Sequence, residues 1–391
     1  MTRRGHARGA CALIGALAAL FVGGVARADV ASDTGAAILV FPKIVVDTAD
    51  PPRTSRGRVD TLIRISNLST KLISMHCFWV NANGHCSNDP SVFCDPNALS
   101  SGCGDSGYCV RGWSETDFAV SITARQPVAW LASRGARPCD SSAGSGLPCF
   151  PLGPTRPGPN GQDNGTSLVL GVPEDPFIGE LKCVAVDANG VPVDRNDLIG
   201  EAEIIREPEG ELVDVTGYNA IGIPALPGQN NGDDTLVLGG PAAEYSSCPN
   251  ILILDHFFDF ATDPVANASV TTTLTLVPCS EDFLRQAPVS TPVQFLVFNE
   301  FEQRFSTSRK VVCFEDIGIS RIDTLAPGRS LFSAAVSGTL TGQTRIRGVG
   351  ESGHTLLGVA EEFRTDSGSA AFNLHFHGTR PGSDYIYLPP N

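Results

Sequence analysis

The stretch at residues 60–84, DTLIRISNLSTKLISMHCFWVNANG, predicts two β-strands joined by a short polar turn at residues 67–70. Successive side chains of a strand point to opposite faces, so Ile63 and Ile65 share one face of the first strand. The second strand gathers four residues on one face: Ile73, Met75, Cys77 and Trp79. The stretch therefore predicts a β-hairpin whose two strands each have a buried face.

A related pattern occurs at residues 293–315, VQFLVFNEFEQRFSTSRKVVCFE. Its first strand ends in Asn299 and its second strand carries Cys313, just as the first pattern contains Asn67 and Cys77. Each pattern also follows an apolar strand that carries a proline: Pro42 within residues 36–46, and Pro278 near the end of residues 270–279. The common order of these features predicts a repeated β-sheet module, and a proline within a strand suits an edge or a β-bulge.

Short apolar strands separated by turn residues run through the chain, which contains 41 Gly and 28 Pro. After residue 28 no segment has the pattern of an amphipathic helix of three turns, so the sequence predicts an all-β fold of two tandem antiparallel β-sandwich modules. In architecture alone, the chain resembles secreted bacterial proteins with immunoglobulin-like or fibronectin-like β-sandwich modules. Such a resemblance implies no particular function.

The expected organisation has four parts. They are a signal peptide at residues 1–28, a first module at 29–206, an irregular connecting segment at 207–269 and a second module at 270–391. The first module includes a Cys-rich insert at 86–109 and a long loop at 134–176. Within the connecting segment, the apolar run ILILDHFFDFA at 251–261 is compatible with a strand or with a short buried helix.

The N-terminal 28 residues have the pattern of a secretory signal. A basic segment with Arg3, Arg4 and Arg8 precedes an apolar run at residues 10–25, and Ala26-Arg27-Ala28 forms an A-x-A cleavage site. No second hydrophobic span follows. We therefore expect a secreted or periplasmic protein with no membrane span after signal cleavage.

The charge balance is acidic, with a formal net charge of −14. Cleavage after residue 28 removes four arginines and no acidic residue, which leaves 24 basic and 42 acidic residues and a net charge of −18. This excess of negative charge argues against nucleic acid and anionic membranes as partners. An extracellular protein or a glycan is the expected partner.

Of the twelve cysteines, eleven follow the signal peptide, and a secreted protein is expected to use them in disulfides. The insert has four of them, expected to form two local cross-links: Cys86, Cys94, Cys103 and Cys109. Cys139 and Cys149 bracket a Gly/Ser-rich loop and form a further expected pair. Cys77 and Cys183 are expected to bridge the two sheets of the first module. Cys313 is expected to pair with Cys279 or Cys248, or to stay free.

Two groups of residues are candidate metal ligands. His375 and His377, two residues apart on the final strand, share one face, and His354 or His256 could supply a third ligand. Oxygen ligands for Ca²⁺ are offered around one hairpin by Asp187, Asn189 and Asp194, although Asp and Asn are also ordinary turn residues. In the run LDHFFD, Asp255, His256 and Asp259 could form an acid–base group or a hydrogen-bonded core cluster.

These features favour a secreted, non-catalytic structural, adhesive or ligand-binding protein without a cofactor. One alternative is a secreted metal-dependent hydrolase that uses the His375/His377 strand. Another is a subunit of a surface assembly, joined through a sheet edge or through the odd cysteine.

Overall fold

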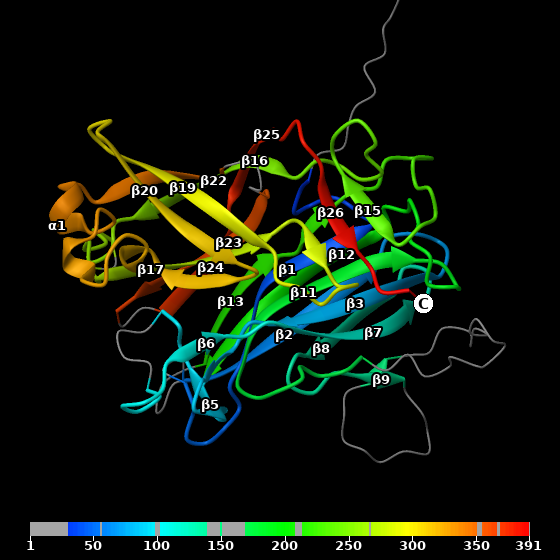
Figure 1. Ribbon diagram of the computed structural model, residues 1–391, viewed down its shortest axis with the longest axis horizontal. Helices are drawn as coiled ribbons and strands as arrows, with labels where there is room; N and C mark the ends of the chain where they lie inside the picture. The colour runs from blue at the N-terminus through cyan, green and yellow to red at the C-terminus, as the bar shows by residue number, and fades with distance from the viewer. Residues whose placement is uncertain are drawn as a thin grey trace, which may run out of the picture.

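The computed structural model describes residues 30–54, 57–97, 102–138, 149–150, 169–207, 213–265, 267–349, 354–365 and 368–390. The fold is all-β, as the sequence predicts, and is built from several antiparallel sheets (Figure 1). Within those ranges, no helix combines the length and the apolar character that a membrane span requires.

The first pair of sheets forms a sandwich-like unit. Sheet I has the order β14 (Ile221–Ile223), β1 (Ile38–Val46), β11 (Phe177–Val186), β3 (Ile73–Asn81) and β7 (Ser114–Ile122). Sheet II has the order β13 (Asp214–Asn219), β12 (Leu198–Glu207), β2 (Arg58–Asn67) and β8 (Pro127–Leu131). The two sheets pack on a shared apolar core that contains Phe41, Ile63, Trp79 and Trp130.

The second pair of sheets repeats this arrangement. Sheet III has the order β20 (Arg304–Val312), β19 (Ser290–Asn299), β22 (Thr341–Gly348), β16 (Pro249–Phe257) and β25 (His375–Thr379). Sheet IV has the order β21 (Glu315–Gly318), β17 (Val270–Pro278), β23 (Leu356–Arg364) and β24 (Gly368–Asn373). Leu254, Phe295 and Phe332 belong to the core between them.

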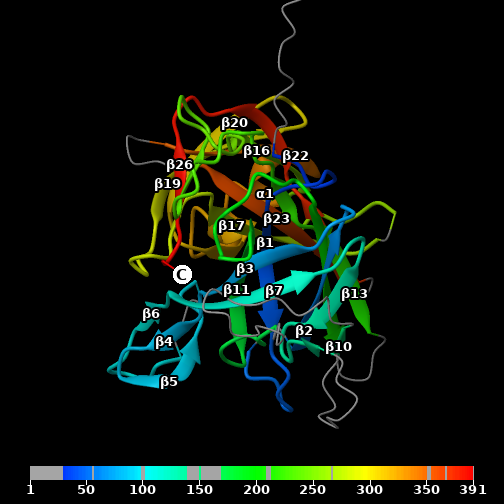
Figure 2. The same cartoon turned by 90° about the vertical axis from the view of Figure 1, so that its right-hand side faces the viewer.

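Smaller elements surround the two pairs. Strands β15 (Thr235–Leu238), β26 (Asp384–Tyr387) and β18 (Glu281–Asp282) form one small sheet, and β9 (Arg137–Pro138) pairs with β10 (Cys149–Phe150). The Cys-rich insert forms the sheet β5 (Asp89–Cys94), β4 (Gly84–Cys86) and β6 (Cys109–Arg111), which projects from the body (Figure 2). The helical turns are η1 (Ile319–Arg321), η2 (Pro327–Arg329) and α1 (Ala334–Ser337).

The prediction of a β-hairpin at residues 60–84 is wrong. Its first strand, β2, lies in sheet II, and its second strand, β3, lies in sheet I between β11 and β7. The turn between them carries the chain from one sheet to the other. The burial patterns explain the difference, because β2 alternates between buried and half-buried residues whereas β3 is buried on both faces except at His76. In the second copy the predicted hairpin is present, since β19 pairs with β20.

The prediction that Pro42 lies at an edge or a β-bulge is confirmed, because β1 has a bulge at this residue. The register between β1 and β11 shifts between Phe41 and Ile44, which is where Pro42 and Lys43 lie. A bulge accommodates the missing N–H of proline within a strand that has neighbours on both sides. By contrast, Pro278 ends β17 directly opposite Leu356.

The segment at residues 207–269 is not an irregular connector. It supplies β13 and β14 to the first pair of sheets, β15 to a small sheet and β16 to sheet III. The apolar run at 251–261, for which strand and helix were both open, begins in strand β16. The second pair of sheets therefore starts at β16, before the boundary predicted at residue 270.

The two pairs of sheets pack against each other as one body. Every residue of β1 and of β11 is buried, because sheet I has sheet II on one face and the second half of the chain on the other. On that second face, Phe78 stacks on Phe283 with ring centroids 4.2 Å apart. Lys43 forms buried ion pairs with Asp316 at 2.8 Å and Glu361 at 2.9 Å.

Four disulfides join described cysteines. They link Cys77 to Cys183, Cys86 to Cys103, Cys94 to Cys109, and Cys248 to Cys279. Cys77 and Cys183 do not bridge two sheets, because they are directly opposed on the neighbouring strands β3 and β11 of sheet I. Cys313 is free and buried. The expected pair Cys139–Cys149 lies outside the residues whose side chains the structure describes.

Candidate functional site

The outer face of sheet III is a broad surface of mixed polar and apolar side chains. Along β16, Leu252, Leu254 and His256 are buried in the core, so the residues between them point outward. The outer face thus comprises Ser306, Ser308 and Lys310 on β20, Gln294, Leu296 and Phe298 on β19, Gln343, Arg345 and Arg347 on β22, Ile251, Ile253 and Asp255 on β16, and His375 and His377 on β25. Figure 1 shows these five strands side by side along the upper edge of the molecule.

The strand register arranges this face in rows. Leu296 is opposite Arg345, Arg345 is opposite Ile253, and Ile253 is opposite His375. The next outward row contains Gln294 opposite Arg347, and His377 opposite Ile251. Two arginines on β22 and two histidines on β25 therefore flank a strip of isoleucine on β16.

The sequence correctly places His375 and His377 on one face of a strand, and both are exposed. Asp255 lies beside the first of them, with its Oδ2 3.9 Å from His375 Nε2. Among the described residues, no third histidine comes close enough to this pair to share a metal ion. His256 is in the core, where its Nε2 lies 2.9 Å from Thr344 Oγ1, and burial lowers its pKa from 6.5 to about 4. A metal at His375 and His377 stays a prediction.

The proposed calcium ligands lie in turns and bond to the backbone. Asp187 Oδ1 accepts hydrogen bonds from the N–H groups of Asn189 and Val191, at 2.7 and 3.0 Å. Asp194 Oδ2 accepts one from Gly228 N–H at 2.7 Å. Among the described residues, the one group of three metal-ligand side chains close enough to share an ion is Cys86, Cys94 and Cys103, whose sulfurs are used in disulfides.

The third candidate group does not assemble into an acid–base site. Asp255 lies on the outer face, whereas His256 points into the core. Asp259 accepts hydrogen bonds from the backbone N–H groups of Thr272 and Ser320, and burial raises its pKa to about 6. These contacts tie Asp259 to strand β17 and to the helical turn η1, so the structure supports the interpretation of this residue as part of a hydrogen-bonded core cluster.

A cleft of about 480 Å³ opens at one end of the outer face. The half-buried rings of Phe257 and Phe298 line it, together with polar groups from three neighbouring strands: Asp255, Asn299, Glu300, Thr341 and Gln343. Glu300 Oε1 accepts hydrogen bonds from Thr341 N–H and Oγ1–H, each 2.8 Å long, which fixes the rim of the cleft. Aromatic rings beside amide and carboxylate groups can hold a polar, ring-shaped ligand.

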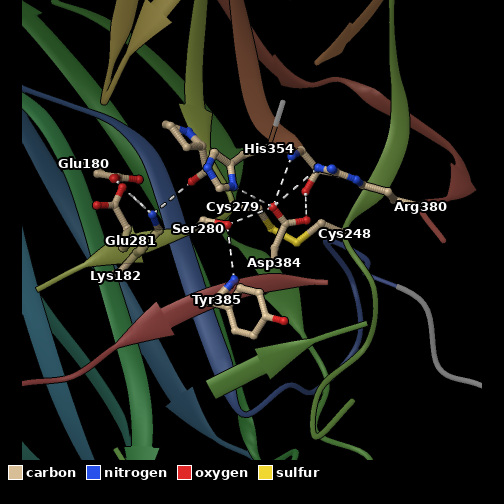
Figure 3. Close-up of a disulfide and its surroundings, with 12 residues drawn as sticks. Glu180, Lys182, Cys248, Cys279, Ser280, Glu281, His354, Arg380, Asp384 and Tyr385 are labelled. Atoms are coloured by element: carbon tan, nitrogen blue, oxygen red, sulfur yellow. Dashed lines mark hydrogen bonds and ion pairs between the residues drawn. A yellow bond between two sulfur atoms is a disulfide. The ribbon is translucent and has the colours of Figure 1, made fainter. Parts of the chain in front are cut away.

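A smaller pocket of about 280 Å³ lies at the opposite end, where Arg347, His354 and Arg380 meet above Thr355. Below it, Asp384 is buried beside the Cys248–Cys279 disulfide (Figure 3). Its Oδ1 accepts from Ser280 Oγ–H at 2.8 Å and its Oδ2 from Thr355 Oγ1–H at 2.6 Å. His354 Nδ1 lies 3.5 Å and an Arg380 terminal nitrogen 4.0 Å from the same carboxylate.

Asp384 remains ionised because of these contacts. Burial acts to raise its pKa, but the hydrogen bonds from His354, Thr355 and Ser280 together outweigh burial and lower the pKa below 3.8. The buried carboxylate is therefore a fixed negative charge that holds His354 and Arg380 at the pocket.

The residues Arg345, Arg347, Arg380 and Asp384 were missed by the sequence reasoning. One local signal could have found two of them, because the run QTRIR at 343–347 repeats arginine with period two and so places both on one face of a strand. No local signal points to Asp384, whose partners come from residues 280, 354 and 355.

No protein family matches the chain, and no curated protein is similar to it in sequence.

Proposed function

We propose that the protein is a secreted, non-catalytic binding protein that holds an extracellular glycan on the outer face of sheet III. The observation that carries this proposal is the exposed five-stranded face itself, with the aromatic cleft at one end and the polar pocket at the other. A polysaccharide is a long ligand, and such a face offers it contacts over the length of several strands.

The scaffold behind this face suits a preformed binding surface. Leu252, Leu254, Phe295 and Ile346 anchor the inner side of sheet III in the core. The pocket end is tied further by the Cys248–Cys279 disulfide. A surface held rigidly before binding loses less conformational freedom when the ligand arrives.

Secretion through a signal peptide at residues 1–28 is part of the proposal. The four disulfides support an oxidising compartment, where such bonds persist. Immunoglobulin-like modules remain a proposal about architecture, supported by two packed antiparallel sheets in each half. The strand order differs from that of an immunoglobulin constant domain, in which the first strand pairs with the second, because β1 pairs with β11 and β14.

The hydrolase alternative uses the His375/His377 strand, beside which Asp255 lies, and it requires a further metal ligand beyond those that the described residues supply at this place. The surface-assembly alternative gains little from Cys313, because a buried thiol is not accessible for an intermolecular disulfide.

Glycan binding is tested by applying the purified, fluorescently labelled full chain to an array of neutral and acidic glycans. The variant Phe298→Ala removes one aromatic wall of the cleft and is expected to weaken binding. Val215→Ala, an exposed position on β13 of sheet II, is the matched control and is expected to bind like the wild type. Absence of binding by the wild-type chain to any glycan would overturn the proposal.

A further inference from the structure

The outer face of sheet III carries a concentration of positive charge on an otherwise acidic chain. Arg345 and Arg347 lie on β22, Lys310 lies on β20, and Arg380 follows β25. None of Arg345, Arg347 and Lys310 forms an ion pair with a carboxylate in the part of the chain that the structure describes. The whole chain has a net charge of −14, so this face differs in sign from the molecule as a whole.

The negative groups near this face neutralise little of its charge. Asp255 lies at the cleft end, where it accepts a hydrogen bond from Gln343 Nε2 at 3.1 Å. Asp384 is 1% exposed and is saturated by Ser280 and Thr355, so it presents no free oxygen to the pocket above it. Away from the cleft, the surface therefore presents the guanidinium groups of β22, the imidazoles of β25 and the isoleucines of β16, while the carboxylates of Asp255, Glu300 and Glu362 lie at the cleft end.

The register fixes the spacing of the charged groups. Arg345 and Arg347 are two residues apart on one strand, which separates them by roughly 7 Å. Strand β16 lies between β22 and β25, so Arg345 and His375 project from strands separated by roughly 10 Å. The result is a two-by-two grid of arginine and histidine, with Ile251 and Ile253 as the floor between its two sides.

At least one of these arginines is held in place. The Arg345 guanidinium lies 5.5 Å from the centroid of the Phe298 ring, and its Nε–H donates to Gln343 Oε1 at 3.3 Å. A guanidinium that is already oriented loses less rotational freedom when it binds a planar anion such as a carboxylate. Arg380 is positioned in a comparable way by the buried charge of Asp384.

We infer that the outer face of sheet III binds an acidic polysaccharide, with carboxylate or sulfate groups on the Arg345–Arg347–His375–His377 grid and in the Arg347–His354–Arg380 pocket. The inference rests on the proposed glycan-binding function and adds the class of glycan. Charge complementarity identifies the occupant, because arginines repeated along β22, facing imidazoles across an apolar floor, match a polymer with repeated anions on sugar rings. The strongly acidic remainder of the chain would repel polyanions that do not fit this face.

The test measures the dissociation constants of the full chain for four probes at low and at physiological salt. Polygalacturonate carries carboxylates, dextran sulfate carries sulfates, dextran is neutral, and a single-stranded DNA oligonucleotide represents another class of polyanion. Tighter binding to one or both acidic polysaccharides than to dextran, with affinity that falls as salt rises, is expected. The first two probes distinguish the carboxylate from the sulfate form of the ligand.

The variant R345Q/R347Q removes two positive charges from the grid and should weaken acidic-polysaccharide binding by roughly 2- to 30-fold, from the range for individual exposed ion contacts. The control R285Q/R329Q removes two exposed arginines elsewhere and changes the net charge equally, so it should bind like the wild type. A second variant, R380Q, should weaken the same binding. Equal unfolding midpoints for all variants would show that the losses are not due to misfolding.

The outcomes separate the two proposals. Binding of neutral glycans without a preference for acidic ones overturns the inference and leaves the proposed function standing, whereas no binding to any glycan overturns both. Equally tight DNA binding that is lost in R345Q/R347Q would identify a general polyanion surface and would contradict the inference. A wild-type dimer that dissociates in R345Q/R347Q would show instead that the face binds a second acidic copy of the chain.

Discussion

Lys182 and Glu281 form an ion pair at 3.0 Å although both side chains are fully buried. Lys182 lies on β11 of sheet I, and Glu281 lies on β18 in the second half of the chain. The Lys182 ammonium also donates to Glu180 at 3.2 Å and to the Pro278 carbonyl at 3.1 Å, so each of its three hydrogens has an acceptor (Figure 3). This cluster joins the two halves of the molecule through charged groups shielded from water.

Replacing Lys182 by Met is predicted to destabilise the protein strongly. The methionine fills a similar volume but leaves Glu180, Glu281 and the Pro278 carbonyl without their shared donor. Removing one partner from a buried ion pair costs about 3–5 kcal/mol. Urea unfolding of the wild type and of K182M measures the difference. The control Lys310→Met changes an exposed lysine on β20 and should shift stability by less than about 0.5 kcal/mol.

If K182M lost no more stability than the K310M control, the carboxyl groups of Glu180 and Glu281 would have adapted fully to the absence of the lysine. The cluster would then contribute nothing to the contact between the halves.

Glu180 is predicted to make the protein less stable as the pH rises from 6.5 to 8. Burial and the nearby negative charge of Glu281 raise its pKa from 4.5 to about 8, despite the opposing effect of Lys182. The folded state therefore binds more protons than the unfolded state between these values, so stability falls with rising pH by up to about 1.4 kcal/mol per unit. Below pH 6.5 the lowered pKa of His256 acts in the opposite direction.

The measurement is the free energy of unfolding at several values between pH 6.5 and pH 8. Glu180→Gln removes the titrating group and should abolish the slope. Asp259→Asn is the control, because the pKa of Asp259 is about 6 and most of its proton is already lost in the folded state when this window begins. An unchanged slope in E180Q would assign the pH dependence to another group.

The sequence could show where strands end more readily than which strands pair. Asn67 and Asn299 were both identified at the ends of matching strands, and both have the same local role. Asn67 Oδ1 accepts from Ser69 N–H and Asn299 Oδ1 accepts from Phe301 N–H, each two residues ahead. Yet one turn carries the chain to another sheet and the other closes a hairpin. Strand β2 intersperses polar residues among its apolar ones throughout, whereas β3 contains the unbroken apolar run CFWV at residues 77–80. That difference was the available clue to the sheet change.

The candidate face was only partly predictable for a similar reason. Strand periodicity correctly placed His375 and His377 together, because both belong to one short segment. Their neighbours Arg345 and Asp255 come from two other strands, and the register that brings them together depends on pairing distant in sequence. The packing of the two halves around Lys43 and Lys182 had no local signal, since a lysine in a strand ordinarily indicates exposure.

Removal of metal ions is predicted to leave the stability of the protein unchanged. Asp187 and Asp194 use carboxylate oxygens to hold turn N–H groups, an arrangement that is satisfied without an ion. The thermal unfolding midpoint should therefore be the same with EDTA and with added Ca²⁺ or Zn²⁺, because a ligand stabilises only the state that binds it.

A midpoint that falls with EDTA would contradict this expectation. Recovery with Ca²⁺ that is lost in D187A would support the calcium loop, and recovery with Zn²⁺ that is lost in H375A/H377A would revive the hydrolase alternative.

The disulfide between Cys77 and Cys183 is predicted to contribute more to global stability than the one between Cys94 and Cys109. The first closes a loop with a sequence separation of 106 and the second one of 15. In the chain-entropy description, cross-linking loops of these lengths stabilises the folded state by about 4.7 and about 3 kcal/mol. Cys77 and Cys183 are also fully buried, so replacing them by alanine adds a packing loss in the core.

Urea unfolding of C77A/C183A and of C94A/C109A, followed by tryptophan fluorescence, compares the two contributions. The variant Cys313→Ala is the matched control, because it removes a buried sulfur without removing a cross-link. The decrease in unfolding free energy of C313A measures the packing contribution of one buried sulfur. If the decrease for C77A/C183A is no more than twice as large, the cross-link itself contributes little. The insert near Cys94 has few apolar residues to bury, so its variant should open locally and become sensitive to protease while the midpoint for the main body changes little.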